Sequence, residues 1–538
     1  MSPCSLIPFF APASAALFEP IERPESDDLN LNQVPEAASN PSFMKRLLYL
    51  PFFLLLALAA NANNIEVTNI VLTDQNAGAG TTVIQFDLNW ENSWRISVGP
   101  ANYDAAWVFA KYRVNGGPWR HTNISGVGAA PAGASVEAVD NLGAFVYRSV
   151  DGNGDVSYSG IELEWNYEAN SVDASAVVDV QVFALEMVYV PEGEFHLGTG
   201  FGGIGAENEV GEFRTRGSVF PTFYSSYLVT SEAAVTVGGG AGELDYSIPG
   251  DGSRPGDGLG PIPAAFPLGF AAFYCMKYEM SQSQYVGFFN TLTQTQRVAL
   301  DVTGVGGKGQ DTELNRNGVN WPDAGNATTT LPDVPLNYVN NQIMLAYLDW
   351  AGLRPISETE YEKAGRGTAA PVNNEYAWGS ANIHATDYEY QGFGTTSERI
   401  SNPGEGVGNA IYNATNGTPT GPKRCGILAA SAPNASREET GGSFYGIMEL
   451  TGNLYERLIS VGNPEGRAFA GTHGNGIISF SGTHNVATWP SDNTGLGYRG
   501  GSFFNGPNFI RLSDRYDAST VLAGANNRIG FRGVRTAN

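Results

Sequence analysis

The hydrophobic pattern of this chain changes near residue 186, and the change divides the sequence into two kinds of structure. Before it, short runs such as 65–72, 82–88 and 177–184 are apolar or alternate between apolar and polar residues. Alternation of this kind is typical of β-strands, and no helical period occurs in this part of the sequence. We therefore expect residues 63–185 to form an all-β, sandwich-like domain.

After this point the chain combines short strands, long glycine-rich loops and a few short helices. Ser281 begins a capping box, and Tyr285 and Phe288 follow on one apolar helix face. A second helix is expected from Asn340 to Trp350, and a second capping box opens a third at Ser357. The 67 glycines of the chain suit tight turns better than long helices. We expect residues 186–538 to be a loop-rich α+β domain.

The start of the chain contains an export signal in an unusual position. The basic residues Lys45 and Arg46 follow Met44, an apolar run extends over 47–59, and the small residues Ala60 and Ala62 suit cleavage. We expect residues 44–62 to be a signal peptide, and residues 1–43 to be a disordered, non-native extension upstream of the true start.

The apolar run is shorter than the roughly 20 residues that span a bilayer. No transmembrane anchor is therefore expected after cleavage, and a retained anchor is the alternative. The mature protein would be exported to the periplasm, the cell surface or the medium.

Charge and cysteine content exclude several classes of function. The chain has 54 acidic and 30 basic residues and a formal net charge of −24, whereas nucleic-acid binding needs basic patches. We expect no nucleic-acid partner. The three cysteines are Cys4, Cys275 and Cys425, and no Cys-x-x-Cys pair can build a thiolate zinc site. Cys275 and Cys425 are interpreted as two separate buried thiols, with a disulfide as the alternative.

Several motifs follow one another in the second part of the chain in a fixed order. They lie at 187–195, 277–281, 351–367, 445–456, 499–502 and 530–532. In this order they resemble the sulfatase-modifying-factor family, whose fold is that of the formylglycine-generating enzyme. Tyr455 stands where this family usually has tryptophan. The resemblance implies a C-type-lectin-like core wrapped in long loops.

The resemblance also implies where catalysis would occur. In the family's enzyme, two cysteines shortly after Arg-Gly-Gly-Ser hold copper and oxidise a sulfatase cysteine to formylglycine. The matching positions here are Asn505 and Ile510, and Cys425 is the last cysteine of the chain. Soft thiolates bind Cu(I), so copper is not expected. Ser502 is a weak catalytic candidate because no general base accompanies it, and a turn-forming role is the alternative.

Calcium is the metal that the resemblance favours, because hard cations prefer carboxylate and carbonyl oxygens. The residues matching one structural calcium site are Glu449, Gly452, Leu454 and Glu456, and those matching a second are Asn382 and Ile383. The alternative is that Glu449 and Glu456 are solvated or paired with arginine.

The segment 503–516 is the candidate binding face. It mixes aromatic rings, amides and a guanidinium group, which is the chemistry of many interfaces. The candidate ligand-binding residues are Phe503, Phe504, Asn505, Asn508, Arg511 and Tyr516. In lectin-like folds this stretch crosses the ligand-facing side, and the alternative is that about half of these side chains pack the core.

The leading hypothesis is an exported, non-catalytic binding or surface-assembly protein whose ligand is a protein or a glycan. One alternative is a divergent oxidoreductase of the formylglycine-generating type that modifies sulfatases. A second alternative, a structural component of a secretion or gliding apparatus, rests on analogy with the family.

Overall fold

The computed structural model describes residues 65–200, 209–217, 224–246, 254–490, 493–522 and 524–537. All of these residues belong to one compact unit. The predicted extension 1–43 and signal peptide 44–62 lie outside the described residues. Within the described ranges, no helix combines the length and the apolar character needed to cross a membrane.

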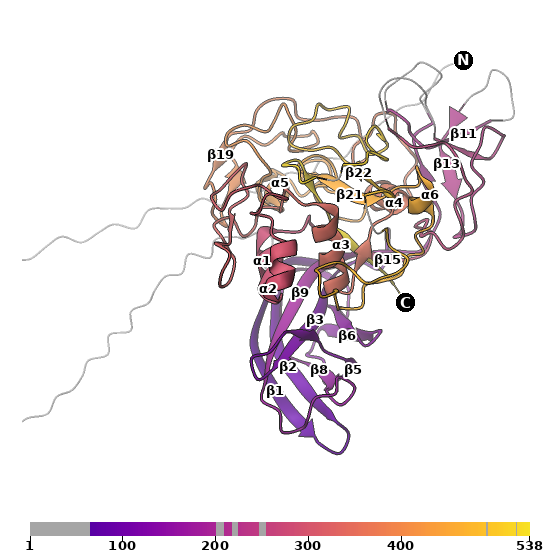
Figure 1. Cartoon of the computed structure of the whole chain (residues 1–538). Coiled ribbons are helices and arrows are strands. Elements are labelled where there is room, and N and C mark those ends of the chain that lie inside the picture. Colours follow the sequence, from indigo (N-terminus) through magenta and orange to yellow (C-terminus); the bar gives the residue numbers. More distant parts are fainter. Residues whose placement is uncertain are drawn as a thin grey trace, which may run out of the picture. The chain divides into compact units, whose positions relative to one another are not determined.

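Strands predominate, and helices are few and short, so the expected mixed α/β composition is confirmed (Figure 1). The β-rich region before the expected boundary contains β1 (Glu66–Asn76), β2 (Thr81–Arg95), β3 (Asp104–Val114), β4 (Arg120–His121), β5 (Ile124–Val127), β6 (Ala134–Val139), β7 (Gly143–Arg148), β8 (Gly152–Asn166) and β9 (Val178–Val190). The later strands are β10 (Phe195–Leu197), β11 (Arg214–Arg216), β12 (Tyr224–Ser225), β13 (Tyr227–Val229), β14 (Leu244–Asp245), β15 (Phe273–Met276), β16 (Val319–Asn320), β17 (Thr328–Thr329), β18 (Arg354–Pro355), β19 (Tyr390–Gln391), β20 (Arg399–Ile400), β21 (Tyr455–Ile459), β22 (Leu496–Arg499), β23 (Ile529–Gly530) and β24 (Gly533–Thr536).

Two antiparallel sheets pack face to face in the β-rich region. One sheet has the order β1-β2-β8-β5, and the other contains β9, β3, β7 and β6. In β2 every second residue from Ile84 to Trp90 is buried, and these side chains meet Val108 of β3 and Leu163 of β8 in one apolar core. The period-2 pattern of the sequence thus defines the buried face of this sheet.

Strand β9 runs through the expected boundary at residue 186 and joins the two parts of the chain. Its first part pairs with β3, and its last part, from Met187 to Val190, also pairs with β15. The resulting eight-stranded sheet has the order β18-β24-β15-β9-β3-β7-β6, with β4 beside β3. Residues on either side of position 186 therefore belong to one continuous strand.

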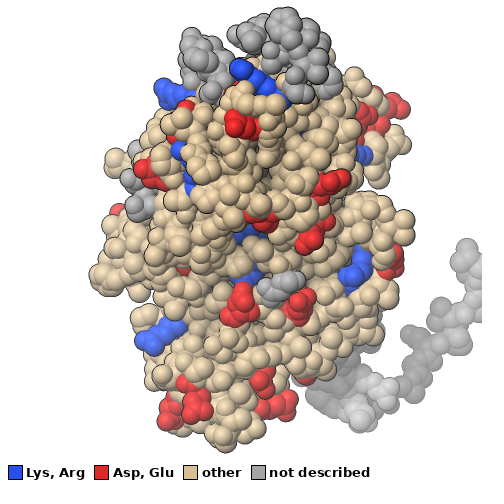
Figure 2. Space-filling view, turned by 90° about the vertical axis from the view of Figure 1, so that its right-hand side faces the viewer, with Lys and Arg blue, Asp and Glu red and all other residues tan. Residues whose placement is uncertain are grey.

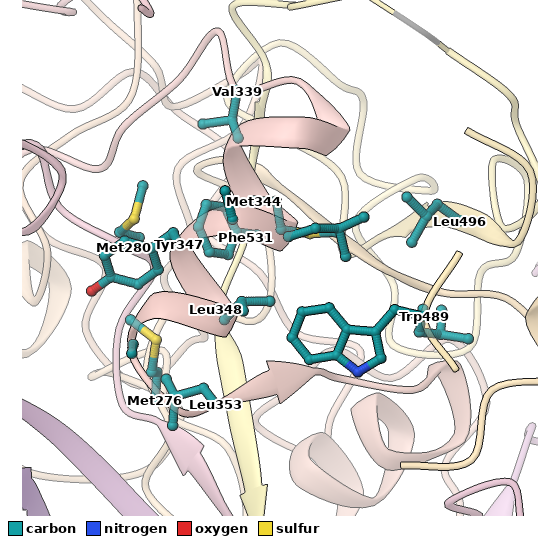
Figure 3. Close-up of a cluster of buried hydrophobic side chains, with 14 of the residues drawn as sticks. Met276, Met280, Val339, Met344, Tyr347, Leu348, Leu353, Trp489, Leu496 and Phe531 are labelled. Atoms are coloured by element: carbon teal, nitrogen blue, oxygen red, sulfur yellow. The ribbon is translucent and has the colours of Figure 1, made fainter. Parts of the chain in front are cut away.

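Strand β3 is buried on both faces because each face covers a different core. Val108 points into the core of the β-rich region, whereas Trp107 and Phe109 belong to a larger core that includes α1 and α3. Figure 3 shows part of this larger core, where Met344, Tyr347 and Leu348 of α3 meet Phe531 and other apolar side chains.

The helices are α1 (Gln282–Asn290), α2 (Gln294–Ala299), α3 (Asn341–Trp350), α4 (Glu358–Arg366), α5 (Ile427–Ser431) and α6 (Pro464–Arg467). The three predicted helices α1, α3 and α4 are confirmed, including the capping boxes at Ser281 and Ser357. The structure adds that Asn340 is the N-cap of α3. The sequence reading missed α2, although Thr293 and Gln296 form a capping box of the same type.

Helix α4 is buried on all sides although most of its residues are polar or charged. Its Glu358 accepts hydrogen bonds from Arg499 at 3.0 Å and from Arg515 at 2.6 Å. Glu362 pairs with Arg499 at 2.8 Å and with Arg366 at 3.1 Å. Buried ions are costly unless paired, so these contacts are what allow α4 to lie in the interior.

Replacing Arg499 by Met should destabilise the protein by about 3–5 kcal/mol, because two buried carboxylates would each lose a cationic partner. Urea titration of the free energy of unfolding measures this effect. The matched control is Arg399→Met, at an exposed position, which should stay within about 0.5 kcal/mol of the wild type. Equal unfolding midpoints for the two variants would contradict the assigned role.

Candidate functional site

The turn after β22 positions the residues where the sequence predicts the site. Gly500 and Gly501 both have positive φ, and a Cβ on Gly501 would come within 2.3 Å of Ile510 Cγ2. Only glycine fits this close approach. The fully buried Ser502 follows, and its hydroxyl donates to Asn505 Oδ1 at 2.5 Å. Ser502 therefore stabilises the turn, which is the alternative that the sequence left open for it.

Asn505, at the first thiol position, belongs to a chain of polar contacts. Its Nδ2 donates to the Tyr455 hydroxyl at 3.0 Å, and that hydroxyl donates to Asp517 Oδ2 at 3.0 Å. Burial and the Asp517 carboxylate raise the pKa of Tyr455, so the phenol stays protonated. A tyrosine can accept from the amide and donate to the carboxylate, whereas a tryptophan has only a donor. The Tyr455 hydroxyl can therefore bond to both Asn505 and Asp517, which a tryptophan at this position could not do.

Ile510, at the second thiol position, is fully buried in an apolar cluster with Tyr376, Trp378 and Tyr412. The two positions that would hold a metal through sulfur are thus an amide engaged in hydrogen bonds and an aliphatic core residue.

The two described cysteines lie elsewhere and are free, so their interpretation as separate buried thiols is confirmed. Burial raises the pKa of Cys275 to about 12, and it raises the pKa of Cys425 well above the usual value. Thiolates rather than thiols are nucleophiles and metal ligands. Neither described cysteine is therefore suited to oxidation chemistry at neutral pH.

The predicted binding residues do not all share a surface. Phe503 is buried in a core cluster with Leu454 and Ile427, which is the packing role that the sequence left open for about half of these side chains. Phe504 is 52% exposed, and the Arg528 guanidinium lies 3.5 Å from its ring centroid.

The remaining members of the predicted face differ in exposure. Asn508 is exposed, whereas Arg511 is half-buried. Burial raises the pKa of Tyr376, and the guanidinium of Arg511 partly offsets this rise. Tyr516 is half-buried and packs edge-to-face on Phe509 at 5.1 Å. The exposed residues of the segment are Phe504, Pro507 and Asn508, and Asn505, Phe509 and Tyr516 are half-buried.

Sequence reasoning missed three residues of this region. Tyr455 and Asp517 form the polar chain with Asn505, and Arg528 supports Phe504. The tyrosine in place of tryptophan was the available signal for the first. Asp517 and Arg528 lie in loops far from Tyr455 in sequence, so no local pattern marks them.

The residues predicted for calcium make other contacts in this structure. Arg532 donates to Glu456 Oε1 at 2.6 Å, so its guanidinium supplies the positive charge beside this carboxylate. Glu449 accepts from the Gly426 amide at 2.8 Å. Among the described residues, no three His, Cys, Asp or Glu side chains form a group suited to a metal ion. Glu456 thus shows the arginine pairing that was the alternative, and calcium remains a prediction.

At the second predicted calcium position, backbone groups are engaged. The Asn382 carbonyl accepts from the Trp378 indole at 3.0 Å and from the Gly408 amide at 3.3 Å. Ile383 is half-buried and forms a parallel bridge with Gly408. These contacts fix the loop through hydrogen bonds between protein groups.

Residues 177–537 match the family described as Sulfatase-modifying factor enzyme 1-like domain. This chain belongs to that family. The family expected from the ordered motifs is therefore confirmed, and the matched region begins one residue before β9, the strand that links the two parts of the chain. No curated protein matches the chain.

Among solved structures, this chain is similar to Treponema denticola variable protein 1. The two are 12% identical, and the match covers 66% of this chain and 96% of that protein, with a TM-score of 0.30. A similarity at this level carries no argument about what this chain binds.

Asp514 is a buried carboxyl at the base of the candidate face. It accepts hydrogen bonds from the amides of Val210 and Tyr516, each at 3.2 Å, and burial raises its pKa to about 7. The folded state therefore holds this proton more tightly than the unfolded chain does. The stability that the proton confers at low pH is lost as the pH rises from about 4 to about 7.

The free energy of unfolding of Asp514→Asn, relative to that of the wild type, should rise by about 1–3 kcal/mol between pH 5 and pH 8, because asparagine carries no charge to bury. Denaturant titrations at the two pH values measure the difference. The control Asp387→Asn, at an exposed position, should show no such growth. If Asp514→Asn keeps the pH dependence of the wild type, the buried carboxyl is not responsible for it.

Proposed function

We propose that this chain is an exported, non-catalytic binding or surface-assembly module of the sulfatase-modifying-factor family. The observation that carries the proposal is the state of the two thiol positions. Asn505 is held by Ser502 and Tyr455, and Ile510 is packed in an apolar cluster. A site built in this way can present side chains to a partner, but it has no soft ligand for copper and no nucleophile.

The binding surface proposed here is formed by the exposed Phe504 and Asn508 together with the half-buried Arg528. Stacking against the guanidinium holds the Phe504 ring in one orientation while leaving half of it accessible. Aromatic and arginine side chains of this kind are frequent anchors of interfaces, because a fixed ring loses little entropy on binding. The exposed Asn508 adds an amide with hydrogen-bonding capacity to the same segment.

A protein is the partner that this chemistry favours, and a glycan is the alternative. The charged side chains on the face in Figure 2 are scattered among neutral ones, with no extended basic area among the residues drawn in colour. That the partner is not a nucleic acid is proposed from the net charge of −24, because phosphate backbones require clustered cations.

The purified protein, supplied with Cu(I) and oxygen, should not convert a cysteine in a sulfatase-type peptide to an aldehyde. Mass spectrometry of the peptide measures the product, and a copper-loaded formylglycine-generating enzyme serves as the positive control. Aldehyde formation above the protein-free background would overturn the non-catalytic assignment. It would favour the divergent oxidoreductase instead.

Phe504→Ala should reduce partner capture about tenfold or more, as expected for an anchor residue. Purified protein and the variant are compared for binding to an envelope fraction and to a glycan array. The matched control is Phe480→Ala, because Phe480 is 76% exposed and lies in a different loop. Equal loss in both variants would indicate non-specific apolar binding, and no loss in Phe504→Ala would place the binding surface elsewhere.

A further inference from the structure

The first half of strand β9 has a free edge. This strand pairs with β3 along 178–188, whereas β15 pairs with its other side only along 187–190. After Met276 the chain leaves the sheet and continues into α1. Along residues 180–184, no strand of the described chain therefore lies on the side of β9 that faces away from β3.

The backbone groups of β9 face alternately toward β3 and away from it. In an antiparallel pair, both the N–H and the C=O of one residue face the partner strand, and those of the next residue face away. The Tyr189 amide donates to the Tyr103 carbonyl at 2.9 Å, so the odd-numbered residues of β9 face β3. The Lys277 amide donates to the Glu186 carbonyl at 3.0 Å, so the even-numbered residues face away.

Val180, Val182 and Ala184 are the even-numbered residues along the free edge. The register of β9 with β3 has no shift from Val178 to Val188, so the alternation holds over the whole edge. The described chain offers the backbone groups of these three residues no hydrogen-bond partner. Only another extended chain presents donors and acceptors at the matching spacing, so a strand is the partner that would satisfy this row.

A groove of about 570 Å³ lies beside residues 182–185 of β9, between the start of β1 and helix α1. Figure 1 shows α1 beside β9. The accessible part of the lining is polar, with Glu66, Ser283 and Thr396 exposed and Gln284 half-buried. A strand occupies roughly 160 Å³ per residue at the usual spacings within and between sheets, so the groove has room for about three or four residues.

The edge of β9 lacks the features with which natural proteins prevent the addition of another strand. The edge strand β1 of the facing sheet has such features, because its register shifts twice and Asn69 and Asp74 have positive φ. Residues 178–186 have no register shift, no positive φ, no proline and no lysine. The edge of β9 is therefore suited to accept a strand, whereas that of β1 is not.

The charged side chains that line the groove are acidic. Glu66 is exposed and Asp333 is half-buried, and the described lining includes no Lys, Arg or His. The nearby Arg424 donates to the Glu398 carbonyl, at 2.8 and 3.0 Å. A strand with lysine or arginine side chains is therefore favoured, whereas a second copy of this edge would bring like charges together.

We propose that the free edge of β9 binds an extended, basic segment of a partner protein. The segment adds a strand beside residues 180–184, in line with β15, and its lysine or arginine side chains lie near Glu66 and Asp333. No residue of the segment 503–516 lines the groove, so this site holds or fails independently of the proposed Phe504 surface.

A short peptide that alternates valine with lysine is the probe, and its analogue with glutamate in place of lysine is the control. Isothermal titration calorimetry should show the lysine peptide binding at least about tenfold more tightly, because the groove is acidic. The lysine peptide with every backbone amide N-methylated keeps the charges but has no N–H donor, and it should not bind. No binding of the lysine peptide at millimolar concentration, or equal affinities for it and either analogue, would overturn the proposal.

Hydrogen exchange measured by mass spectrometry locates the bound peptide. Exchange of the amides in 178–185 should slow about tenfold or more when the lysine peptide is added, because the free N–H groups of this edge become hydrogen-bonded. Exchange in residues 71–76 of β1 should stay unchanged and serves as the internal control. Protection of β1 instead of β9 would place the peptide on the other edge and would count against the proposal.

Ala184→Pro should abolish peptide binding, because it removes an N–H at the free edge and no hydrogen bond to β3. Asp333→Asn leaves the backbone unchanged and should weaken binding of the lysine peptide about three- to tenfold, whereas the exposed control Asp387→Asn should not. Unchanged binding in both Ala184→Pro and Asp333→Asn would show that this edge is not the site. A dimer of the protein that Ala184→Pro dissociates would assign the edge to a second copy, which also contradicts the proposal.

Discussion

The pairing of buried charges around helix α4 is the interaction on which the rest of the described structure depends. Glu358 and Glu362 are fully buried, and Arg499 and Arg515 reach them from strands and loops that come more than a hundred residues later in the chain. Each of these ions would cost several kcal/mol if left unpaired. The helix, β22 and the loop that carries Arg515 must therefore assemble together.

This pairing also determines the geometry of the candidate site. Arg499 is the last residue of β22, and the glycine turn and Ser502 follow directly. The ion pairs thus fix the start of the segment 503–516 without any contribution from the thiol positions. The residues that form the buried ion pairs differ from those at the thiol positions. Asparagine and isoleucine can therefore occupy positions 505 and 510 without disturbing the ion pairs. On the proposal that Asn505 and Ile510 stand at the thiol positions, this separation would let the chain keep the motifs without the metal-binding sulfur.

Much of the fold could be predicted from local patterns. Alternation identified the buried face of β2, and capping boxes identified α1 and α4, because these signals are contained in a few neighbouring residues. The continuity of β9 across residue 186 could not be predicted in this way. The strand is buried by pairing with β3 on one side and β15 on the other, and strand pairing depends on residues distant in sequence.

The site was predicted less completely for the same reason. The exposed Phe504 and the engaged Asn505 lie in the expected segment, but alternate packing places Phe503 in the core. Asp517 and Arg528 meet Tyr455 and Phe504 only after folding.

The central claim is that the chain keeps the ion-paired fold of the family, while Asn505 and Ile510, at the positions of the metal-binding thiols, cannot hold copper. The copper content of the purified protein after incubation with Cu(I) and removal of excess metal tests this most directly. Elemental analysis should find less than about one tenth of an equivalent per chain, because an amide and an aliphatic side chain replace the soft ligands. A stoichiometry near one copper per chain, retained after dialysis against a chelator, would contradict it.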